Sequence, residues 1–91
     1  MGMQIKFESS FQKDLKKLKD KKIKTRLLEL IQKIKETKSL TDLKELKKLA
    51  GFSDYYRIRI DNHRLGLKKL DDETVVLIRF LNRKDIYKKF P

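Results

Sequence analysis

The stretch YYRIRIDNHRLGLKKLDDETVVLIRFL, residues 55–81, decides the fold. Apolar and polar side chains alternate over residues 55–60, which is the pattern of a half-buried β-strand. Asp61-Asn62 is a turn pair, and residues 64–70 return as the next strand. The first half of the stretch therefore predicts a β-hairpin.

The second half of the stretch extends the hairpin by one more strand. Asp71-Asp72 marks another turn, and residues 74–81 are apolar on both faces. A strand with two apolar faces is covered on both sides, so we expect it in the centre of the sheet. The stretch as a whole predicts a three-stranded antiparallel meander.

The residues before this stretch predict a strand followed by helices. Met3, Ile5 and Phe7 alternate with polar residues and indicate a β-strand. Ser9 with Gln12 three positions later resembles a capping box that opens a first helix. An apolar stripe at helical spacing predicts a second, longer helix that folds back on the first; the stripe comprises Ile23, Leu27, Leu30, Ile31 and Ile34.

Two further segments complete the chain. Residues 39–50 predict a short third helix, with Asp42 and Glu45 as a second capping box and Gly51 as its end. Residues 82–91 form a polar, basic tail. The predicted fold class is α+β, with an N-terminal strand, a helical hairpin, a short third helix and the meander, in a single domain of residues 1–91.

The composition excludes several classes of function. The chain has 91 residues, no cysteine and one histidine, which excludes disulfide frameworks, thiolate metal sites and multi-histidine metal centres. No apolar run approaches the roughly 20 residues of a membrane span. We therefore expect a cytoplasmic protein with no cofactor, no bound metal and no membrane partner. A net charge of +12 indicates a polyanionic or acidic partner.

The arginines are concentrated in the predicted sheet. Lysines dominate residues 9–50, where they are typical of a solvated helix surface. Five of the six arginines lie after residue 50: Arg57, Arg59, Arg64, Arg79 and Arg83. A guanidinium group binds phosphate in a bidentate manner, whereas lysine acts as a point charge. The distribution favours a phosphate-binding site on the sheet.

Spacing brings four of these arginines toward one place. Arg57 and Arg59 share a strand face, about 7 Å apart by the rise of a strand. The tight turn places Arg64 on the neighbouring strand, and Arg83 directly follows the last strand. If Tyr87 folds back along the sheet, four guanidinium groups and one phenol converge. In the alternative reading, the arginines pair at a wet surface with acidic residues such as Asp54, Asp61 and Asp85.

These segments together resemble the RelE/ParE superfamily of toxins from type II toxin–antitoxin systems. The motifs that carry the resemblance are Leu43-x-x-Leu46-x-x-Leu49 with Gly51, Tyr56-Arg57-Ile58-Arg59, Asn62-His63-Arg64-Leu65, Val75-Val76-Leu77 and Asn82-Arg83-Lys84-Asp85-Ile86-Tyr87. The resemblance covers essentially the whole chain. It implies a toxin held inactive by a cognate acidic antitoxin in a hetero-oligomer. The RelE branch cleaves mRNA in the ribosomal A site.

The resemblance also assigns roles to residues. It implies a metal-independent endoribonuclease (an mRNA interferase) whose catalytic residues are Arg57, Arg59, Arg64, Arg83 and Tyr87. Lys68, Lys84 and Lys88 are expected to contact mRNA or ribosomal RNA. The best-known RelE pattern has lysines where this chain has Arg57 and Arg59. Arginine does not release its proton near neutral pH, so neither residue is expected to act as a general base.

The expected reaction uses the 2′-hydroxyl group of the RNA as nucleophile. Arg64 and Arg83 would stabilise charge at the scissile phosphate, while Arg57 and Arg59 would hold phosphate. Tyr87 could stack on a base, orient the nucleophile or act as the acid. His63, at the hairpin turn, is expected to pack or lie on the surface rather than to catalyse.

Other side chains receive structural interpretations. We expect Phe52 and Phe80 in the core, Tyr56 on the apolar face of its strand, and Asp85 beside an arginine that it orients. Two other functions stay open. One is a ParE-like toxin that inhibits DNA gyrase, although toxins of the ParE branch generally lack the complete set of four arginines and one tyrosine. The other is a non-catalytic basic module that binds nucleic acid.

Overall fold

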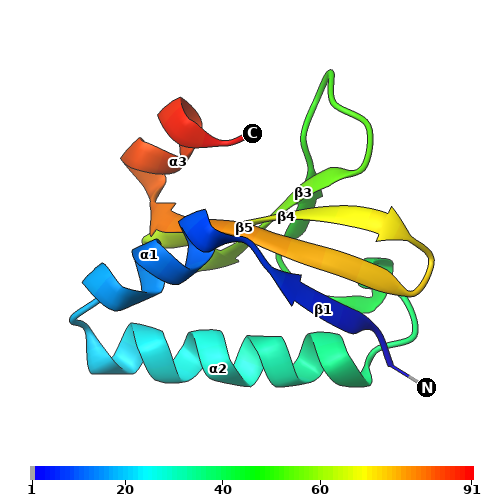
Figure 1. The fold of residues 1–91 in the computed structure, drawn as a ribbon, viewed down its shortest axis with the longest axis horizontal. Helices are drawn as coiled ribbons and strands as arrows, with labels where there is room; N and C mark the ends of the chain where they lie inside the picture. The colour runs from blue at the N-terminus through cyan, green and yellow to red at the C-terminus, as the bar shows by residue number, and fades with distance from the viewer. Residues whose placement is uncertain (1) are drawn as a thin grey trace.

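The computed structural model describes residues 2–91 and arranges their strands in one sheet with the order β1-β5-β4-β3-β2 (Figure 1). The strands are β1 (Gln4–Phe7), β2 (Leu46–Lys48), β3 (Tyr55–Ile60), β4 (His63–Asp71) and β5 (Thr74–Asn82). β1 runs parallel to β5, and the other neighbours are antiparallel. The predicted meander is therefore confirmed as β3, β4 and β5, and β5 lies inside the sheet as expected.

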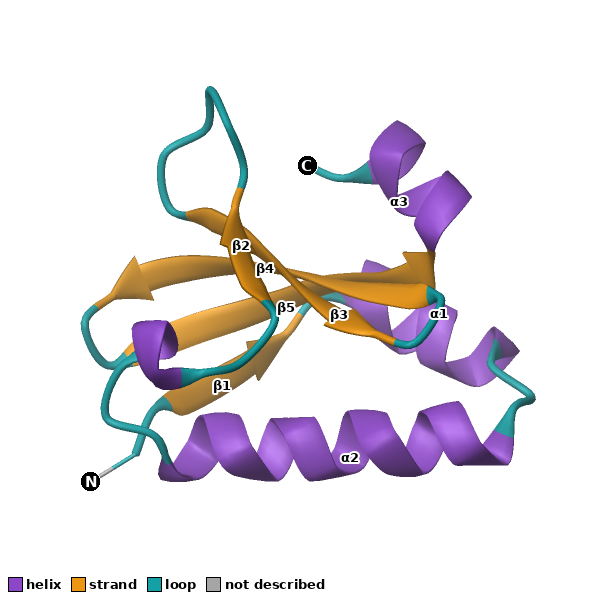
Figure 2. Ribbon diagram, turned by 180° about the vertical axis from the view of Figure 1, so that it is seen from behind, coloured by secondary structure: helices purple, strands orange, loops and turns teal. Residues whose placement is uncertain are grey.

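Helices lie on both faces of this sheet. α1 (Ser9–Lys17) and α2 (Lys21–Glu36) lie on one face, and α3 (Arg83–Lys89) lies on the other (Figures 1 and 2). The apolar stripe of α2 is buried as predicted, with Leu27 and Ile34 fully inaccessible to solvent. Both pack in one core with Leu65 and Leu67 of β4. Burying each such side chain contributes about 2 kcal/mol to stability.

The predicted third helix over residues 39–50 is wrong. The segment forms one 3-10 turn, Leu40–Asp42, and then the edge strand β2. Ser39 caps the 3-10 turn, and Glu45 adopts a positive φ of 63° that no helix accepts. Leu46 pairs with Ile58 of β3 and packs against the core. Pairing with the open edge of β3 thus overrides the helical propensity of these residues.

The segment predicted as a polar, basic tail contains a helix that the sequence analysis does not predict, because residues 83–89 form α3. Asn82 caps this helix by accepting a hydrogen bond from the backbone N–H of Asp85 at 2.9 Å. Ile86 is buried on the sheet. Asparagine followed three residues later by an acidic residue is a helix-start signal that the polar composition of the segment concealed.

Two smaller expectations also fail. The first helix is capped at Glu8 without a side-chain hydrogen bond, and Gln12 bonds to the carbonyl of Phe7 rather than closing a box with Ser9. Phe52 is 49% exposed on the loop between β2 and β3, whereas Phe80 is in the core as predicted. The loop carries Phe52 beyond the area that the helices cover.

Side chains of α1 complete the hydrogen bonding of β5. β1 pairs with β5 only as far as the Phe7–Leu77 pair, which leaves the next residues of β5 without a strand partner on that side. The hydroxyl of Ser10 donates to the carbonyl of Ile78 at 2.6 Å. The carboxylate of Asp14 accepts from the backbone N–H of Phe80 at 2.9 Å. Helix α1 therefore replaces the missing strand at this edge.

Asp14 also forms the most buried ion pair of the described residues. Its second oxygen lies 2.9 Å from the guanidinium of Arg79, and the carboxylate side chain is only 4% exposed. One carboxylate thus accepts from a backbone N–H and pairs with a side-chain cation together. Breaking a buried pair by removing one partner costs about 3 kcal/mol or more, because the other charge stays desolvated.

We therefore predict that Asp14→Ala lowers the free energy of unfolding by about 3 kcal/mol. Glu29→Ala is the matched control, because Glu29 is an exposed acid on α2 and its loss should change stability by less than about 0.5 kcal/mol. Urea unfolding followed by circular dichroism measures both variants. Equal stability of the two variants would contradict this account of the β5 edge.

Candidate active site

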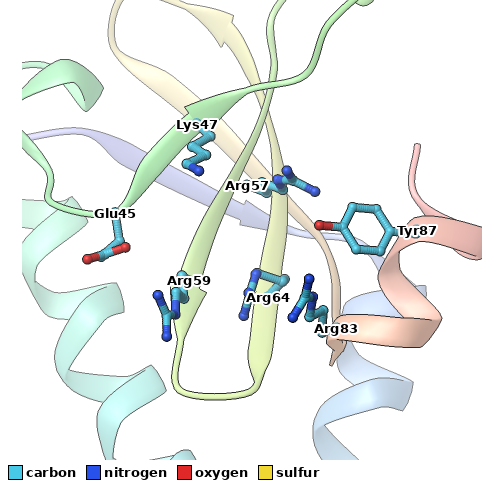
Figure 3. Close-up of a pocket in the computed structure, with 7 residues that line it drawn as sticks. All are labelled: Glu45, Lys47, Arg57, Arg59, Arg64, Arg83 and Tyr87. Atoms are coloured by element: carbon cyan, nitrogen blue, oxygen red, sulfur yellow. The ribbon is translucent and has the colours of Figure 1, made fainter.

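A hollow opens on the face of the sheet that carries α3 (Figure 3). Its volume is about 290 Å³, and β2, β3, β4 and α3 contribute side chains to it. The lining residues are Glu45, Lys47, Arg57, Arg59, Arg64, Arg83 and Tyr87. All five residues that the sequence predicted as catalytic therefore lie in one pocket.

The register of the hairpin places the strand arginines. Arg59 of β3 lies directly opposite Arg64 of β4, and Arg57 lies opposite Gly66. The guanidinium of Arg64 donates to the backbone carbonyls of Asp61 at 3.1 Å and His63 at 2.9 Å. These two backbone carbonyls thus fix the direction of Arg64 without supplying a formal negative charge.

Helix α3 adds the remaining two predicted residues. Arg83 is the first residue of α3, and its backbone N–H donates to the carbonyl of Asn62 at 2.9 Å. Tyr87 follows one helical turn later, so both side chains lie on the same side of the helix. The guanidinium carbon of Arg57 lies 4.9 Å from the centre of the Tyr87 ring. Figure 3 shows the hydroxyl of Tyr87 directed toward Arg57.

The pocket arginines are not neutralised by acidic side chains. Within residues 2–91 the ion pairs are Arg26–Asp61, Lys69–Asp72 and Arg79–Asp14, and none of them uses a pocket arginine. The alternative of a surface ion-pair network is therefore wrong for the pocket. Burial and then the positive charge of Arg59 lower the pKa of Arg64 from its ordinary value. A bound anion would relieve this repulsion between like charges.

The same positive charges act on the phenol of Tyr87. The charge of Arg57, and to a smaller extent that of Arg83, lowers the pKa of Tyr87 from its ordinary value of 10.0. The side chain is 57% exposed, so solvent and a substrate reach it. A phenol with a lowered pKa is a stronger proton donor than free tyrosine.

Two lining residues escaped the sequence analysis. The spacing of residues 39–50 predicts a helix that contains Lys47, with Glu45 in its capping box. The positive φ of Glu45 and the pairing of Lys47 with Arg57 bring both side chains to the pocket instead. Figure 3 shows them on the opposite side of the pocket from Tyr87. Their placement depends on β2, which no periodicity in the sequence indicated.

Other predicted residues lie outside the pocket lining. Lys68 packs over the Tyr55 ring at 5.2 Å, while Lys84 and Lys88 are exposed on α3. His63 stacks on Phe80 with ring centroids 5.2 Å apart, and burial lowers its pKa.

Asp85 also differs from the prediction. Its carboxylate accepts from the side-chain amide of Asn82 at 3.2 Å, so it supports the cap of α3 rather than orienting an arginine.

The lining chemistry suits an anion. Arginine and lysine side chains surround the hollow, and Glu45 is the single carboxylate among its lining residues. In residues 2–91, no group of three or more histidine, cysteine, aspartate or glutamate side chains is arranged to hold a metal ion. None of the helices described is long and apolar enough to cross a membrane. The pocket therefore fits a phosphate group held by guanidinium groups.

Comparisons with known proteins agree with this geometry. Residues 5–87 match the family described as ParE toxin of type II toxin-antitoxin system, parDE. The chain is 39% identical over 89 residues to Toxin RelE3 of Methanocaldococcus jannaschii, which covers 98% of this chain and 100% of that protein.

Solved structures share the fold over nearly the whole chain. The RelB–RelE antitoxin–toxin complex from Methanococcus jannaschii superposes with a TM-score of 0.81 at 38% identity, covering 94% of this chain and 99% of that one. The isolated Escherichia coli toxin RelE has a TM-score of 0.72 at 20% identity, covering 97% and 94%, and supports the fold alone. The chain therefore belongs to the RelE/ParE superfamily of toxins from type II toxin–antitoxin systems.

Proposed function

We propose that this toxin is a metal-independent endoribonuclease that cleaves mRNA, acting as one domain over residues 1–91. The observation that carries the proposal is the convergence of Arg57, Arg59, Arg64 and Arg83 with Tyr87 in a single pocket. Their charges have no acidic partner among the described residues. Such a site is preorganised for the extra negative charge of a phosphate that is under attack.

The proposed reaction is an internal transfer within the RNA. The 2′-hydroxyl oxygen attacks the adjacent phosphorus, the bond to the 5′ oxygen breaks, and the products are a 2′,3′-cyclic phosphate and a free 5′-hydroxyl. Arg64 and Arg83 stabilise the charge on the phosphate oxygens. Arg57 and Arg59 hold phosphate, and the fixed direction of Arg64 avoids reorganisation during the reaction.

The proton transfers require groups other than arginine. Tyr87 donates its proton to the departing 5′ oxygen, since the charge of Arg57 makes its phenol more acidic. Glu45 is the one carboxylate of the pocket lining, and we propose that it acts as the general base that accepts the proton of the 2′-hydroxyl group. Figure 3 shows these two side chains on opposite sides of the pocket, which suits an attacking and a leaving oxygen on opposite sides of phosphorus.

We further propose that cleavage takes place in the ribosomal A site. The chain carries a net charge of +12, and lysines occupy exposed positions on the helices of both faces of the sheet. Lys68, Lys84 and Lys88 lie outside the pocket and are assigned contacts with mRNA or ribosomal RNA. Contacts of this kind neutralise phosphates and weaken steeply as salt rises.

A cognate acidic antitoxin is the proposed protein partner, in a toxin–antitoxin hetero-oligomer in the cytoplasm. Support comes from the RelB–RelE complex, in which a relative 38% identical to this chain is bound to an antitoxin. The excess of basic residues fits a partner with acidic segments that fold on binding.

Removal of one pocket arginine should slow cleavage strongly while the fold persists. We predict that Arg83→Ala lowers the cleavage rate about 100-fold or more, because a donor to the transition-state charge is lost. Arg26→Ala is the matched control, since Arg26 is an exposed arginine outside this pocket. Single-turnover cleavage of ribosome-bound mRNA measures both. Equal rates in the two variants would remove Arg83 from the mechanism.

The pH dependence tests the assignment of Tyr87. A phenol can donate its proton only below its pKa, which lies below 10.0 here. We therefore predict that the cleavage rate falls as pH rises through the pKa of Tyr87. Tyr87→Phe should lower the rate about 100-fold and abolish this alkaline decrease. A rate that rises through the titration of Tyr87 would assign it the role of a base instead.

Primer extension in a cell-free translation reaction tests the function as a whole. We expect new 5′ ends within codons of translated mRNA and none on naked mRNA. Ends on both templates would retain the nuclease and discard the ribosome. Intact mRNA together with DNA breaks would favour the gyrase-directed alternative, and intact mRNA and DNA would favour a binding module.

A further inference from the structure

The aromatic ring of Phe90 lies flat against the strand β4 on the pocket face of the sheet. Phe90 follows α3 and is only 7% exposed. A Cβ atom added at Gly66 would lie 2.8 to 2.9 Å from three atoms of the ring, which is closer than real Cβ contacts. The ring therefore occupies a notch that exists because position 66 has no side chain.

A second wall of the notch is the ring of Tyr55. The centroids of the Tyr55 and Phe90 rings are 5.8 Å apart, with an edge-on angle of 67°. Aromatic pairs of this geometry contribute stability beyond the area that they bury. Phe90 thus contacts two neighbouring strands, β3 and β4, from the end of α3.

The notch lies beside the arginine-lined pocket because of the strand register. Gly66 is the partner of Arg57 in the β3–β4 ladder, and Tyr55 precedes Arg57 by two residues on the same strand face. Arg57 in turn is the residue whose guanidinium lies over the Tyr87 ring. The seat of Phe90 and the contact of Tyr87 are therefore neighbours on the sheet.

Helix α3 depends on this seat for its orientation. The helix has seven residues, and a helix of that length is not stable by itself. Its buried side chain is Ile86, and Phe90 extends the anchor beyond the last turn, with its N–H donating to the carbonyl of Ile86 at 3.0 Å. Tyr87 lies between these two anchors and is 57% exposed. Tyr87 is therefore held in place mainly by the anchored residues on either side of it in the chain.

We propose that Phe90 is a positioning residue, which seats in the notch over Gly66 and thereby holds Tyr87 against Arg57. The kinetic part of this inference rests on the proposed nuclease function, whereas the structural part does not. Phe90 touches no reacting atom. It acts through the orientation of α3 alone.

The titration of Tyr87 tests the structural part without any RNA. Carbon-13 NMR of labelled tyrosine rings follows each phenol separately. In Phe90→Ala, and in Gly66→Ala, which fills the notch from the other side, the pKa of Tyr87 should rise toward its ordinary value because Arg57 is no longer beside it. Tyr56 packs against the core, so an unchanged Tyr56 signal shows that the sheet is intact.

Phe52→Ala is the matched control for the loss of an aromatic ring. The Phe52 ring also contacts Tyr55, with centroids 6.1 Å apart, yet it lies on the exposed β2–β3 loop. The pKa of Tyr87 should stay at its wild-type value in this variant. A wild-type titration of Tyr87 in folded Phe90→Ala and Gly66→Ala would overturn the inference.

The cleavage assay tests the kinetic part. Phe90→Ala should lower kcat about tenfold or more while KM stays within twofold, because the phosphate-holding arginines of the strands remain in place. Phe90→Tyr keeps the flat ring and should restore most of kcat. Full activity of Phe90→Ala would overturn the positioning role. If the wild-type protein cleaves no RNA, the proposed function fails, and the titration still decides whether Phe90 positions Tyr87.

Discussion

The carboxylate of Asp14 is the interaction on which the arrangement of this toxin depends. β5 is the inner strand that leads directly into α3, and its outer edge loses its strand partner after Leu77. Asp14 supplies an acceptor to the backbone of Phe80 and a counter-charge to Arg79. The same contact joins the helical layer to the strand from which Arg83 and Tyr87 follow. Contacts on the face of the sheet that carries α1 thus fix the end of β5, and with it the start of the helix that carries Arg83 and Tyr87.

Sequence patterns were sufficient for the parts of the fold that bury apolar side chains periodically. The alternation over residues 55–60 and the two-faced strand over residues 74–81 predicted the meander, because each pattern has one orientation that covers its apolar atoms. The tight turn at Asp61-Asn62 then fixed the register, which placed Arg59 opposite Arg64. The convergence of the strand arginines follows from that register, so the sequence pattern alone predicts it.

The remainder required contacts between distant segments. The leucines of residues 43–49 fit a helix by spacing, yet the segment pairs with the otherwise open edge of β3, and this pairing packs Leu46 against the core. Glu45 lines the pocket only because β2 forms, so its position could not be predicted without that strand. Gly66 likewise shows no signal by itself in the sequence. A glycine is needed there because the ring of Phe90, 24 positions later in the chain, packs against it.

The choice of arginine over lysine at positions 57 and 59 separates charge from proton transfer in this site. A guanidinium group stays protonated throughout the pH range in which proteins are stable, so these residues supply constant charge and no proton. Constant charge at Arg57 has a consequence for its neighbour, because it lowers the pKa of Tyr87 at every working pH. In the proposed reaction, proton transfer is then left to two other pocket residues, Tyr87 and Glu45. The orientation of α3 consequently matters more here than in a site whose strand residues could also exchange protons.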